Sequence, residues 1–274
     1  MAKTWVLITV KTYPSISIKY DETVCTAGIT REGKWIRIYP IPFRKLAYAE
    51  QYPKYQWIEI DLVKNTSDFR PESFRPTNID VDNLISYGER VGTKNKWAER
   101  KALLLKTCYT DLSMLITESK TEGLYTSLAV FKPTKIIDFI IEKTEREWNS
   151  NQKASLQQGK LFEDNKQFQV VKKLPYKFSY KFEDCNGRQS TLMNEDWELG
   201  ALYWNCLRHH NGNEEAARHD VKKKYWDEFK SKKELYFFLG TTKLNQLRAP
   251  NPFIIIGTFY PPKEPQLSLF ENMT

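Results

Sequence analysis

Glycine is scarce in this sequence, and the glycines that are present form no nucleotide-binding motif. There are 11 glycines in 274 residues, without a GxGxxG or a GxxxxGK[ST] pattern. A methyltransferase or another nucleotide-binding enzyme needs such a turn between a strand and a helix, because its backbone must approach a phosphate closely. The scarcity argues against these classes, and against ligases and polymerases, which need nucleotide motifs or a longer chain.

Cysteine and histidine are also few. The sequence has 3 histidines, and its 4 cysteines form no CxxC pair; they are Cys25, Cys108, Cys185 and Cys206. Because the cysteines have no close pairs and no histidine at zinc-finger spacing, neither a disulfide framework nor a structural zinc is indicated. We expect a reducing, cytoplasmic compartment and a protein without a cofactor.

Long apolar runs are missing as well. The apolar run near the start is short and ends at Lys11, so it predicts a strand rather than a signal peptide. No stretch approaches the roughly 20 apolar residues that a helix needs to cross a bilayer. We therefore expect no membrane partner.

Positive charge and aromatic side chains are abundant. Lys and Arg number 42 against 34 Asp and Glu, which gives a net charge of +8. Such a surplus is compatible with a polyanionic partner, although it says nothing about the fold. With 41% hydrophobic and 28% charged residues, the composition is that of a folded protein.

Short β-branched and aromatic segments dominate residues 1–148, for which we expect a β-rich N-terminal domain or half. A turn sequence with Gly33 predicts a hairpin over 23–39, and a helix is expected at about 95–106. Residues 64–95 between them are expected to form a long loop. Strands are predicted at 4–11, 23–30, 34–39 and 56–63, with a further strand pair at 126–131 and 135–142.

Residues 149–165 are polar and lack a hydrophobic period, which predicts either a linker or a long loop inside one domain. Residues 166–260 should form an α+β C-terminal domain or half. It contains an alternating strand at 176–182, helices capped by Asn194 and Asn213, and two final apolar strands. The predicted fold class is α+β, with mixed and antiparallel sheets, a few amphipathic helices and an extended C-terminal tail.

The tail at 261–274 contains an apolar pentapeptide that follows Pro261, Pro262 and Pro265. Proline removes a backbone donor and fixes φ, so we expect this tail to stay extended and outside the fold. An extended segment with alternating anchors is a known mode of partner recognition. The alternative is an arm packed against its own domain.

The pentapeptide resembles the sliding-clamp-binding peptide of bacterial replication and repair proteins at all five positions. It consists of Gln266, Leu267, Ser268, Leu269 and Phe270. The resemblance implies that Gln266 hydrogen-bonds at the rim of a pocket on the clamp, while Leu267, Leu269 and Phe270 enter hydrophobic subsites. It implies the bacterial sliding clamp and DNA as partners.

The body of the chain resembles, more weakly, an uncharacterised bacterial family of DNA-associated proteins. The segments that carry this resemblance are KLPYKFSYKF, DWELGALY, FFLGTT and NPFIIIGTFYPP. It implies no demonstrated chemistry, and it is compatible with a DNA glycosylase that acts in phage defence.

A metal-dependent nuclease needs clustered carboxylates, commonly with a lysine on a strand. Glu59 and Asp61 fit this best, because alternation puts both on one face of a strand and Lys64 follows. Other groups fit loosely and are more typical of solvated surface: Asp111 with Glu118 and Lys120, Asp227 with Glu228 and Lys230, and the histidines His209, His210 and His219.

Base excision makes smaller demands on a sequence. It needs aromatic or apolar side chains around a flipped base and one carboxylate that polarises water or stabilises an oxocarbenium-like sugar. Asp196 and Glu198, on either side of Trp197, are the candidate catalytic residues, with Asp196 preferred because neighbouring acids raise its proton affinity. The alternative is that these acids only meet the dipole of a helix.

One strand is a candidate for contacts with DNA. Trp35, Arg37 and Tyr39 alternate onto one face of it, and Arg44 follows. An arginine between aromatic side chains suits a base or a phosphate. The alternative is an aromatic patch that covers the core.

A basic helix over 222–233 is the second candidate. Lys222, Lys223 and Lys224 would face outward, with Trp226 near the rim. Lysines there would position DNA without reading its sequence, although such a face is also typical of ordinary solvated surface.

Three hypotheses follow for a cytoplasmic, nucleoid-associated protein. The first is a metal-independent DNA glycosylase recruited to the clamp, extending to modified bases in phage defence. The second is a metal-dependent nuclease that uses Glu59 and Asp61. The third is a non-catalytic DNA-binding module.

Overall fold

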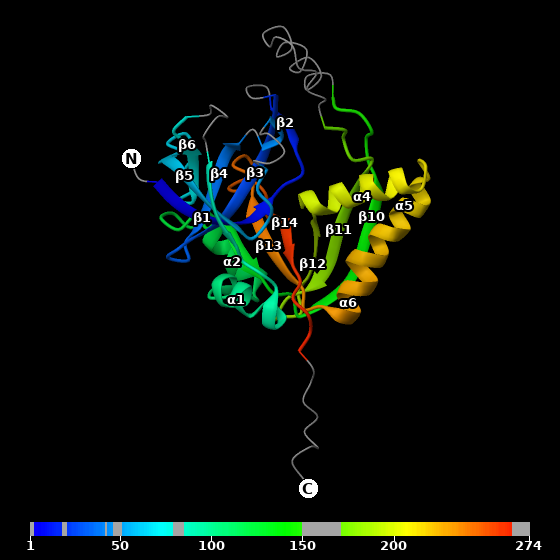
Figure 1. Cartoon of the computed structure of the whole chain (residues 1–274). Coiled ribbons are helices and arrows are strands. Elements are labelled where there is room, and N and C mark those ends of the chain that lie inside the picture. Colours follow the sequence, from blue (N-terminus) through cyan, green and yellow to red (C-terminus); the bar gives the residue numbers. More distant parts are fainter. Residues whose placement is uncertain are drawn as a thin grey trace, which may run out of the picture.

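The computed structural model in Figure 1 describes residues 3–17, 21–41, 43–45, 51–78, 85–149 and 171–264. Strands and helices are both present, so the predicted α+β class is confirmed. The N-terminal half is a small β-barrel, and the C-terminal half combines two sheets with helices that pack against them.

Five strands close into the barrel because β1 pairs with both β3 and β5. In order around the barrel they are β1 (Lys3–Lys11), β3 (Asp21–Thr30), β4 (Trp35–Ile41), β6 (Ser73–Pro76) and β5 (Gln56–Lys64). Outside this ring, β2 (Ser15–Ser17) pairs with β3, and β7 (Ile85–Arg90) pairs with β5. The predicted hairpin at 23–39 is confirmed as β3 and β4.

Several barrel strands are buried on both faces. In β1, Val6 and Ile8 belong to a core made of barrel residues, whereas Leu7 and Val10 pack against the C-terminal half. Successive side chains of a strand point to opposite faces. A strand covered on both sides therefore appears in the sequence as a continuous apolar run.

The C-terminal half contains two sheets that meet at one bridge, where Asn194 lies beside Ile255. The first sheet has the order β14 (Phe253–Phe259), β13 (Tyr236–Thr241), β9 (Leu128–Phe131), β8 (Cys108–Tyr109). The second has the order β10 (Lys135–Lys143), β11 (Tyr176–Glu183), β12 (Gln189–Met193). The two predicted strands near Pro133 exist as β9 and β10, but they lie in different sheets and do not pair with each other.

The helices cover the sheets and connect the halves. They are the 3₁₀ turn η1 (Phe43–Lys45), α1 (Lys94–Leu104), α2 (Leu112–Lys120), α4 (Trp197–His209), α5 (Glu214–Lys222), the π-helical η3 (Lys223–Glu228) and α6 (Phe229–Lys232). None of the helices in the described residues is long and apolar enough to cross a membrane.

The helix caps agree with the sequence in one case and differ in another. Asn213 caps α5 as predicted, since its side chain accepts a hydrogen bond from the N–H of Ala216. The predicted cap Asn194 is wrong, because Asp196 caps α4 by accepting from the N–H of Glu198. Asn194 instead accepts from the N–H of Asp196 and so supports the true cap.

The polar segment 149–165 does not separate two sheets. β10 before it and β11 after it are antiparallel neighbours over their full lengths. Because β10 and β11 belong to one sheet, no domain boundary falls between these two strands, and residues 150–170 lie outside the described part of the chain.

The described start of the tail is bonded to the fold. The N–H of Lys263 donates to the carbonyl of Lys232, and Glu264 pairs with Lys101 at 2.7 Å. The prediction of a tail that is free from Pro261 onward is therefore wrong for residues 261–264. The pentapeptide Gln266–Phe270 lies outside the described residues.

Candidate functional site

A buried ion pair joins the two halves of the molecule. The Lys54 ammonium, in the turn before β5, lies 2.7 Å from both carboxylate oxygens of Asp196. The carboxylate also accepts from the N–H of Thr258 at 3.0 Å and from the N–H of Glu198 at 3.1 Å. Because each of these partners is a donor, Asp196 is ionised and its acceptor sites are occupied.

The two charges support each other in an environment that excludes water. Burial acts to lower the pKa of Lys54, but the Asp196 and Glu198 carboxylates raise it above its ordinary value. Burial raises the pKa of Asp196, and the Lys54 ammonium offsets only part of that rise. Asp196 is thus fully engaged inside the protein, and this partner was not visible in the sequence, where only neighbouring acids were considered.

Glu198 is the accessible carboxylate of this region. It lies in the first turn of α4, 3.4 Å from the Lys54 ammonium, and its side chain is 41% exposed. Burial acts to raise its pKa, but the ammonium groups of Lys54 and Lys11, with a contribution from Lys224, lower it below the ordinary value. Glu198 therefore presents an ionised carboxylate to solvent, as a catalytic carboxylate requires.

Lys11, the last residue of β1, lies in the same region. Its ammonium donates to the carbonyl of Tyr52 at 3.0 Å and lies 4.4 Å from the ring centroid of Phe43 and 5.9 Å from that of Trp197. Burial, together with the neighbouring charge of Lys54, lowers its pKa to about 8. A basic side chain with aromatic neighbours and reduced proton affinity completes the group.

We call Lys11, Lys54, Asp196 and Glu198 the Lys–Asp–Glu cluster. The end of β1 supplies the first residue, the turn before β5 the second, and the start of α4 the two acids. The buried pair fixes the positions of the other two groups. The cluster thus offers the partly exposed carboxylate of Glu198 and the Lys11 amine, whose pKa is lowered and which lies beside the rings of Phe43 and Trp197.

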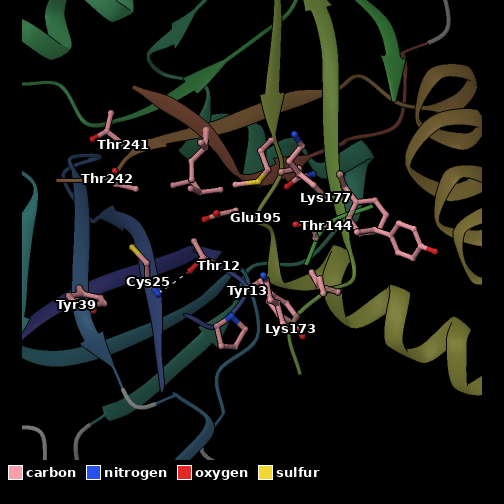
Figure 2. Close-up of a pocket in the computed structure, with 18 of the residues that line it drawn as sticks. Thr12, Tyr13, Cys25, Tyr39, Thr144, Lys173, Lys177, Glu195, Thr241 and Thr242 are labelled. Carbon is pink, nitrogen blue, oxygen red and sulfur yellow. Dashed lines mark hydrogen bonds between the residues drawn. The ribbon is translucent and has the colours of Figure 1, made fainter. Parts of the chain in front are cut away.

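A cavity of about 390 Å³ is lined by chain neighbours of the cluster, since Thr12 and Tyr13 follow Lys11 and Glu195 precedes Asp196. Figure 2 shows Thr12, Tyr13 and Glu195 around it, together with Tyr39 and Thr241 from the barrel and the C-terminal sheet. Burial raises the pKa of Glu195. Glu195 was not predicted as a site residue, and the only signal in the sequence was its position next to Asp196.

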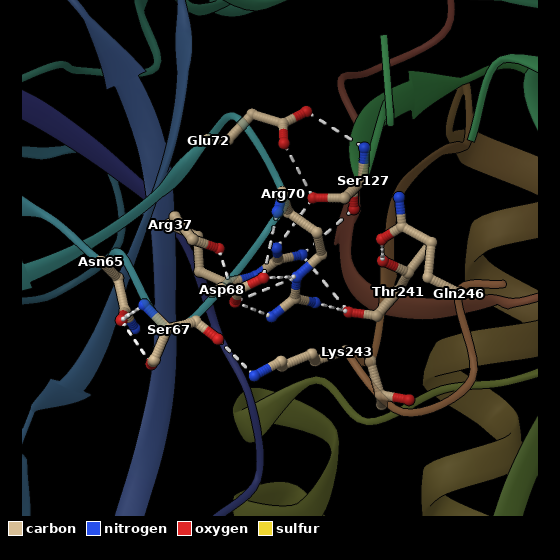
Figure 3. A network of polar contacts seen from close by, with 12 residues as sticks. Arg37, Asn65, Ser67, Asp68, Arg70, Glu72, Ser127, Thr241, Lys243 and Gln246 are labelled. Atoms are coloured by element: carbon tan, nitrogen blue, oxygen red, sulfur yellow. Dashed lines mark hydrogen bonds and ion pairs between the residues drawn. The ribbon is translucent and has the colours of Figure 1, made fainter. Parts of the chain in front are cut away.

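The predicted aromatic face of β4 points toward the C-terminal half. Arg37 is 3% exposed and donates to the hydroxyl of Ser127 at 2.8 Å and to its carbonyl at 3.1 Å (Figure 3). Trp35 meets Phe238 edge-on, with ring centroids 5.7 Å apart. Trp35 and Arg37 therefore fill an internal interface, which agrees with the alternative of a patch that covers the core, while Tyr39 lines the cavity.

A second arginine strengthens this interface. Arg70 pairs with Asp68 at 2.6 Å and donates to the carbonyl of Thr241 at 2.6 Å (Figure 3). Glu72 accepts from both the N–H and the hydroxyl of Ser127. These polar contacts connect the barrel with β9 and β13 and hold the cluster and the cavity at a fixed junction.

The basic helix has two exposed lysines and one that turns toward the cluster. Lys222 and Lys223 are exposed, whereas Lys224 is half-buried and acts on the charge of Glu198. Trp226 packs against the core of the C-terminal half, with the Lys230 ammonium 4.7 Å from its ring centroid.

Arg44 follows Phe43 in η1 and is half-buried. Phe43 packs edge-on against Trp197, with ring centroids 5.5 Å apart. Of the predicted site residues, the structure thus brings Asp196 and Glu198 together, with Lys224 near enough to act on the charge of Glu198, while Arg44 follows Phe43 in the chain.

The predicted nuclease pair lies elsewhere on β5. Glu59 is half-buried and forms an ion pair with Lys3 at 3.6 Å. His210 contacts Asp220 at 2.7 Å. Within the described ranges, no group of three or more His, Cys, Asp and Glu side chains is arranged to hold a metal ion.

The barrel and the C-terminal half match two families separately. Residues 109–274 match the family described as "Domain of unknown function (DUF8757)", and residues 2–106 match "Domain of unknown function (DUF8758)". The chain therefore belongs to the DUF8757 family. The two matches meet between α1 and β8, so the predicted half-boundary at 149 lies inside the second match. No curated protein and no solved structure matches the chain.

Proposed function

We propose that this protein is a metal-independent DNA glycosylase that works at the bacterial sliding clamp, in the cytoplasm at the nucleoid. The observation that carries the proposal is the Glu198 carboxylate, which is partly exposed and held ionised beside two buried lysines. Modified bases, as used in phage defence, are the substrates we favour.

Cleavage of an N-glycosidic bond develops positive charge on the sugar ring. A fixed carboxylate stabilises that charge electrostatically, and it needs neither a metal nor a cofactor. Glu198 suits the role of this stabilising carboxylate because part of its side chain is open to solvent. Asp196 and Lys54 act as positioning residues, since their ion pair and the cap of α4 hold the Glu198 backbone in place.

The surroundings of Glu198 suit a polyanion. The ammonium groups of Lys11, Lys54 and Lys224 all act on its charge. Two exposed lysines, Lys222 and Lys223, precede Lys224 on the same helical segment. Trp197 is half-buried beside the cluster and supplies an aromatic side chain for stacking a flipped base, while the buried Phe43 packs edge-on against it.

Recruitment to the clamp rests on the sequence of residues 266–270. Three apolar side chains of that peptide would enter pockets on the clamp, and the described chain up to Glu264 anchors the segment to the fold. Tethering would raise the local concentration of the protein at newly replicated DNA.

The cavity favours a second candidate function, a non-catalytic module that holds a flipped base. Its volume of about 390 Å³ falls within the range of small-molecule sites, about 300–1,000 Å³. Glu195 and the hydroxyl groups of Thr12 and Tyr13 would supply polar contacts there. Such a module would bind DNA and release no product.

The test is an excision assay in EDTA. The protein is incubated with normal DNA and with DNA that carries modified bases, and each sample is then heated in alkali. A glycosylase leaves abasic sites, so strand breaks should appear only after the alkali step. Intact DNA on every substrate, with binding retained, would favour the non-catalytic module, and breaks that EDTA prevents would favour the nuclease.

Two matched variants locate the reaction. Glu198→Gln should lower base release at least about 100-fold, because the charge that stabilises the sugar cation is lost. Glu195→Gln makes the same change in the neighbouring carboxyl group and should leave the rate within about threefold. The reverse order of effects would place the reaction in the cavity instead of at the Lys–Asp–Glu cluster.

A further inference from the structure

Glu195 lines the cavity and has no part in base excision as proposed above. Its backbone is fixed on both sides, since its N–H donates to the carbonyl of Ile255 at 2.8 Å and its carbonyl accepts from the N–H of Tyr13 at 2.7 Å. Figure 2 shows its side chain among the other side chains that line the cavity. The segment that carries this carboxyl group is therefore held firmly in the cavity wall.

The carboxyl group itself has no partner. Within the described residues it makes neither a hydrogen bond nor an ion pair, and burial alone raises its pKa. Asp196, the next residue, differs completely, because its carboxylate is occupied by the Lys54 ammonium and by backbone N–H groups. A half-buried acceptor without a donor costs free energy, and a ligand that supplies donors would recover that cost.

The basic side chains that line the cavity in the described structure are used elsewhere. Arg37 belongs to the internal interface between the halves. Lys173 donates to the carbonyl of Glu147 at 3.2 Å. Lys177 pairs with Glu142 at 2.8 Å. The cavity therefore suits a ligand that donates hydrogen bonds to the free carboxyl group rather than an anion.

Aromatic side chains form part of the cavity wall. The hydroxyl of Tyr13 donates to the carbonyl of Lys172 at 2.7 Å, and its ring packs so closely on Gly200 that a Cβ atom there would collide with it. Tyr39 and Trp148 also line the cavity. Fixed rings of this kind favour a planar ligand, and the volume of about 390 Å³ is sufficient for a nucleoside.

A second polar group without a partner lines the same cavity. Asn194 is 4% exposed, and its Nδ2 has no hydrogen-bond partner in the described structure. Its Oδ1 accepts from the N–H of Asp196 at 3.0 Å, which assigns the nitrogen to the other side of the amide. An acceptor and a donor, both without partners, thus follow each other in the chain along the cavity wall.

Among the common bases, guanine has the edge that matches this pair of groups. Its N1–H and its N2 amine are adjacent donors that can occupy both oxygens of one carboxylate, and its O6 is an acceptor beside them. Adenine and cytosine present a ring nitrogen with a lone pair beside their amine, which a carboxylate repels. Thymine has one N–H between two carbonyls.

We propose that the cavity is a binding site for a guanine-type base, which donates from N1 and N2 to the Glu195 carboxylate and accepts at O6 from the Asn194 amide. This site is separate from the Lys–Asp–Glu cluster, so the inference goes beyond base excision and does not require it. For the non-catalytic module it names the base that the cavity would hold.

The experiment is calorimetric titration of the full-length protein with single nucleosides, without DNA. 2′-Deoxyguanosine should bind, and 2′-deoxyinosine, which lacks only the N2 amine, should bind at least about 10-fold more weakly because one hydrogen bond to a charged group is lost. 2′-Deoxyadenosine should not bind measurably. Equal affinities for deoxyguanosine and deoxyinosine, or no binding of deoxyguanosine, would overturn the inference.

A guanidinium compound distinguishes a base from other planar donors. Agmatine also carries two adjacent N–H donors, but it has neither the O6 acceptor nor an extended ring system. We expect it to bind more weakly than deoxyguanosine. Binding of agmatine as tight as that of deoxyguanosine would show a general site for donor pairs and contradict the assignment to guanine.

Two variants place the ligand in the cavity. Glu195→Gln removes the charge and one of the two acceptors, so the affinity for deoxyguanosine should fall at least about 10-fold. Glu215→Gln makes the same change at an exposed position on α5 and should leave the affinity unchanged. Unchanged affinity in Glu195→Gln would exclude this carboxyl group as the contact.

The wild-type protein provides a second measurement that holds even if Glu195→Gln does not fold. Cys25 is half-buried and lines the cavity, whereas Cys185 is exposed elsewhere. Under conditions in which iodoacetamide alkylates both thiols of the free protein, saturating deoxyguanosine should slow the reaction of Cys25 and leave that of Cys185 unchanged, as followed by mass spectrometry. Equal slowing of both thiols, or of neither, would place the ligand outside the cavity.

These outcomes are independent of base excision, because no DNA is present. If deoxyguanosine binds as expected and no base is released from any DNA, the glycosylase proposal fails and the guanine site remains. If bases are released and deoxyguanosine does not bind, the glycosylase stands and this inference is wrong.

Discussion

At the scale of single residues, Lys54 and Asp196 decide what the other members of the cluster can do. Their side chains are 142 residues apart in the chain and almost completely buried. A buried pair of this kind adds little net stability compared with apolar residues, but the loss of one partner leaves an isolated charge. The pair therefore fixes Glu198 in place, and Lys54 holds its proton more tightly than Lys11 does.

This account predicts a large asymmetry between single and double variants. Lys54→Met should lower the unfolding free energy by about 3–5 kcal/mol, because Asp196 is left without its counter-charge. Adding Asp196→Asn should recover most of that loss, since the amide oxygen still caps α4. Urea unfolding at pH 7 measures both values.

The pH dependence gives the control. In Lys54→Met, burial without the ammonium raises the pKa of Asp196 further, so the folded state binds a proton more tightly than the unfolded state. The variant should be closest to wild-type stability at about pH 5 and should lose stability as the pH rises toward 8. A single variant no less stable than the double variant at pH 8 would contradict the structural role of the pair.

At the scale of elements, the basic helix divides into two functional parts. One side of this segment is buried against the C-terminal core: Ala217 and Val221 of α5, Tyr225 of the π-helical η3 and Phe229 of α6. Lys222 and Lys223 remain exposed, while Lys224 is half-buried and acts on Glu198. If the protein binds DNA as proposed, we expect the first two lysines to make the phosphate contacts.

Replacing Lys222 and Lys223 by Glu should weaken DNA binding equally on every sequence. Each lost phosphate contact should also reduce the slope of log K against log salt by about 0.9 on duplex DNA, which gives about 1.8 for the pair. Fluorescence anisotropy between low and moderate salt measures both effects. Lys135→Glu with Lys143→Glu changes the net charge equally on exposed positions of β10 and serves as the matched control. Equal losses of DNA affinity in both double variants would mean that Lys222 and Lys223 act only through the net positive charge of the protein.

At the scale of the whole molecule, the two family segments form one unit around a shared core. Leu7, Val10 and Ile29 of the barrel pack with Val130 and Phe238 of the C-terminal sheet. The polar contacts of Arg37 and Arg70 cross the same junction. Because the cluster takes residues from both sides, neither segment alone contains the proposed site.

We propose that the tail connects this assembly to the sliding clamp. Burial of Leu267, Leu269 and Phe270 in pockets of the clamp would stabilise the complex by about 1.5–3 kcal/mol each before ordering costs are subtracted, which is consistent with micromolar binding of about −8 kcal/mol. Leu269→Ala with Phe270→Ala should abolish clamp binding and leave the melting temperature and the activity on DNA unchanged. A pull-down with a bacterial clamp and a thermal melt of the same two proteins measure this.

The opposite pattern identifies a tail packed on its own domain. In that case the double variant should lose several kcal/mol of stability through a cavity, and the wild-type protein should not retain the clamp. Positions 269 and 270 lie outside the described residues, so the contacts of residues 261–264 with α6 and α1 favour neither outcome.

The sequence by itself determined the features that depend on near neighbours. Alternation in YKFSYKF predicted β11, the Gly33 turn predicted the hairpin, and Asn213 predicted the start of α5, because turns, caps and periodicity act over a few residues. Only the tertiary structure decided which partner each charged side chain meets. Arg37 alternates with Ile36 and Ile38 as a solvent-facing side chain would, yet it is buried and donates to Ser127. Asp196 is paired with Lys54 rather than open to a substrate. Both contacts join residues 90 or more positions apart, and no local pattern reports how distant strands cover one another.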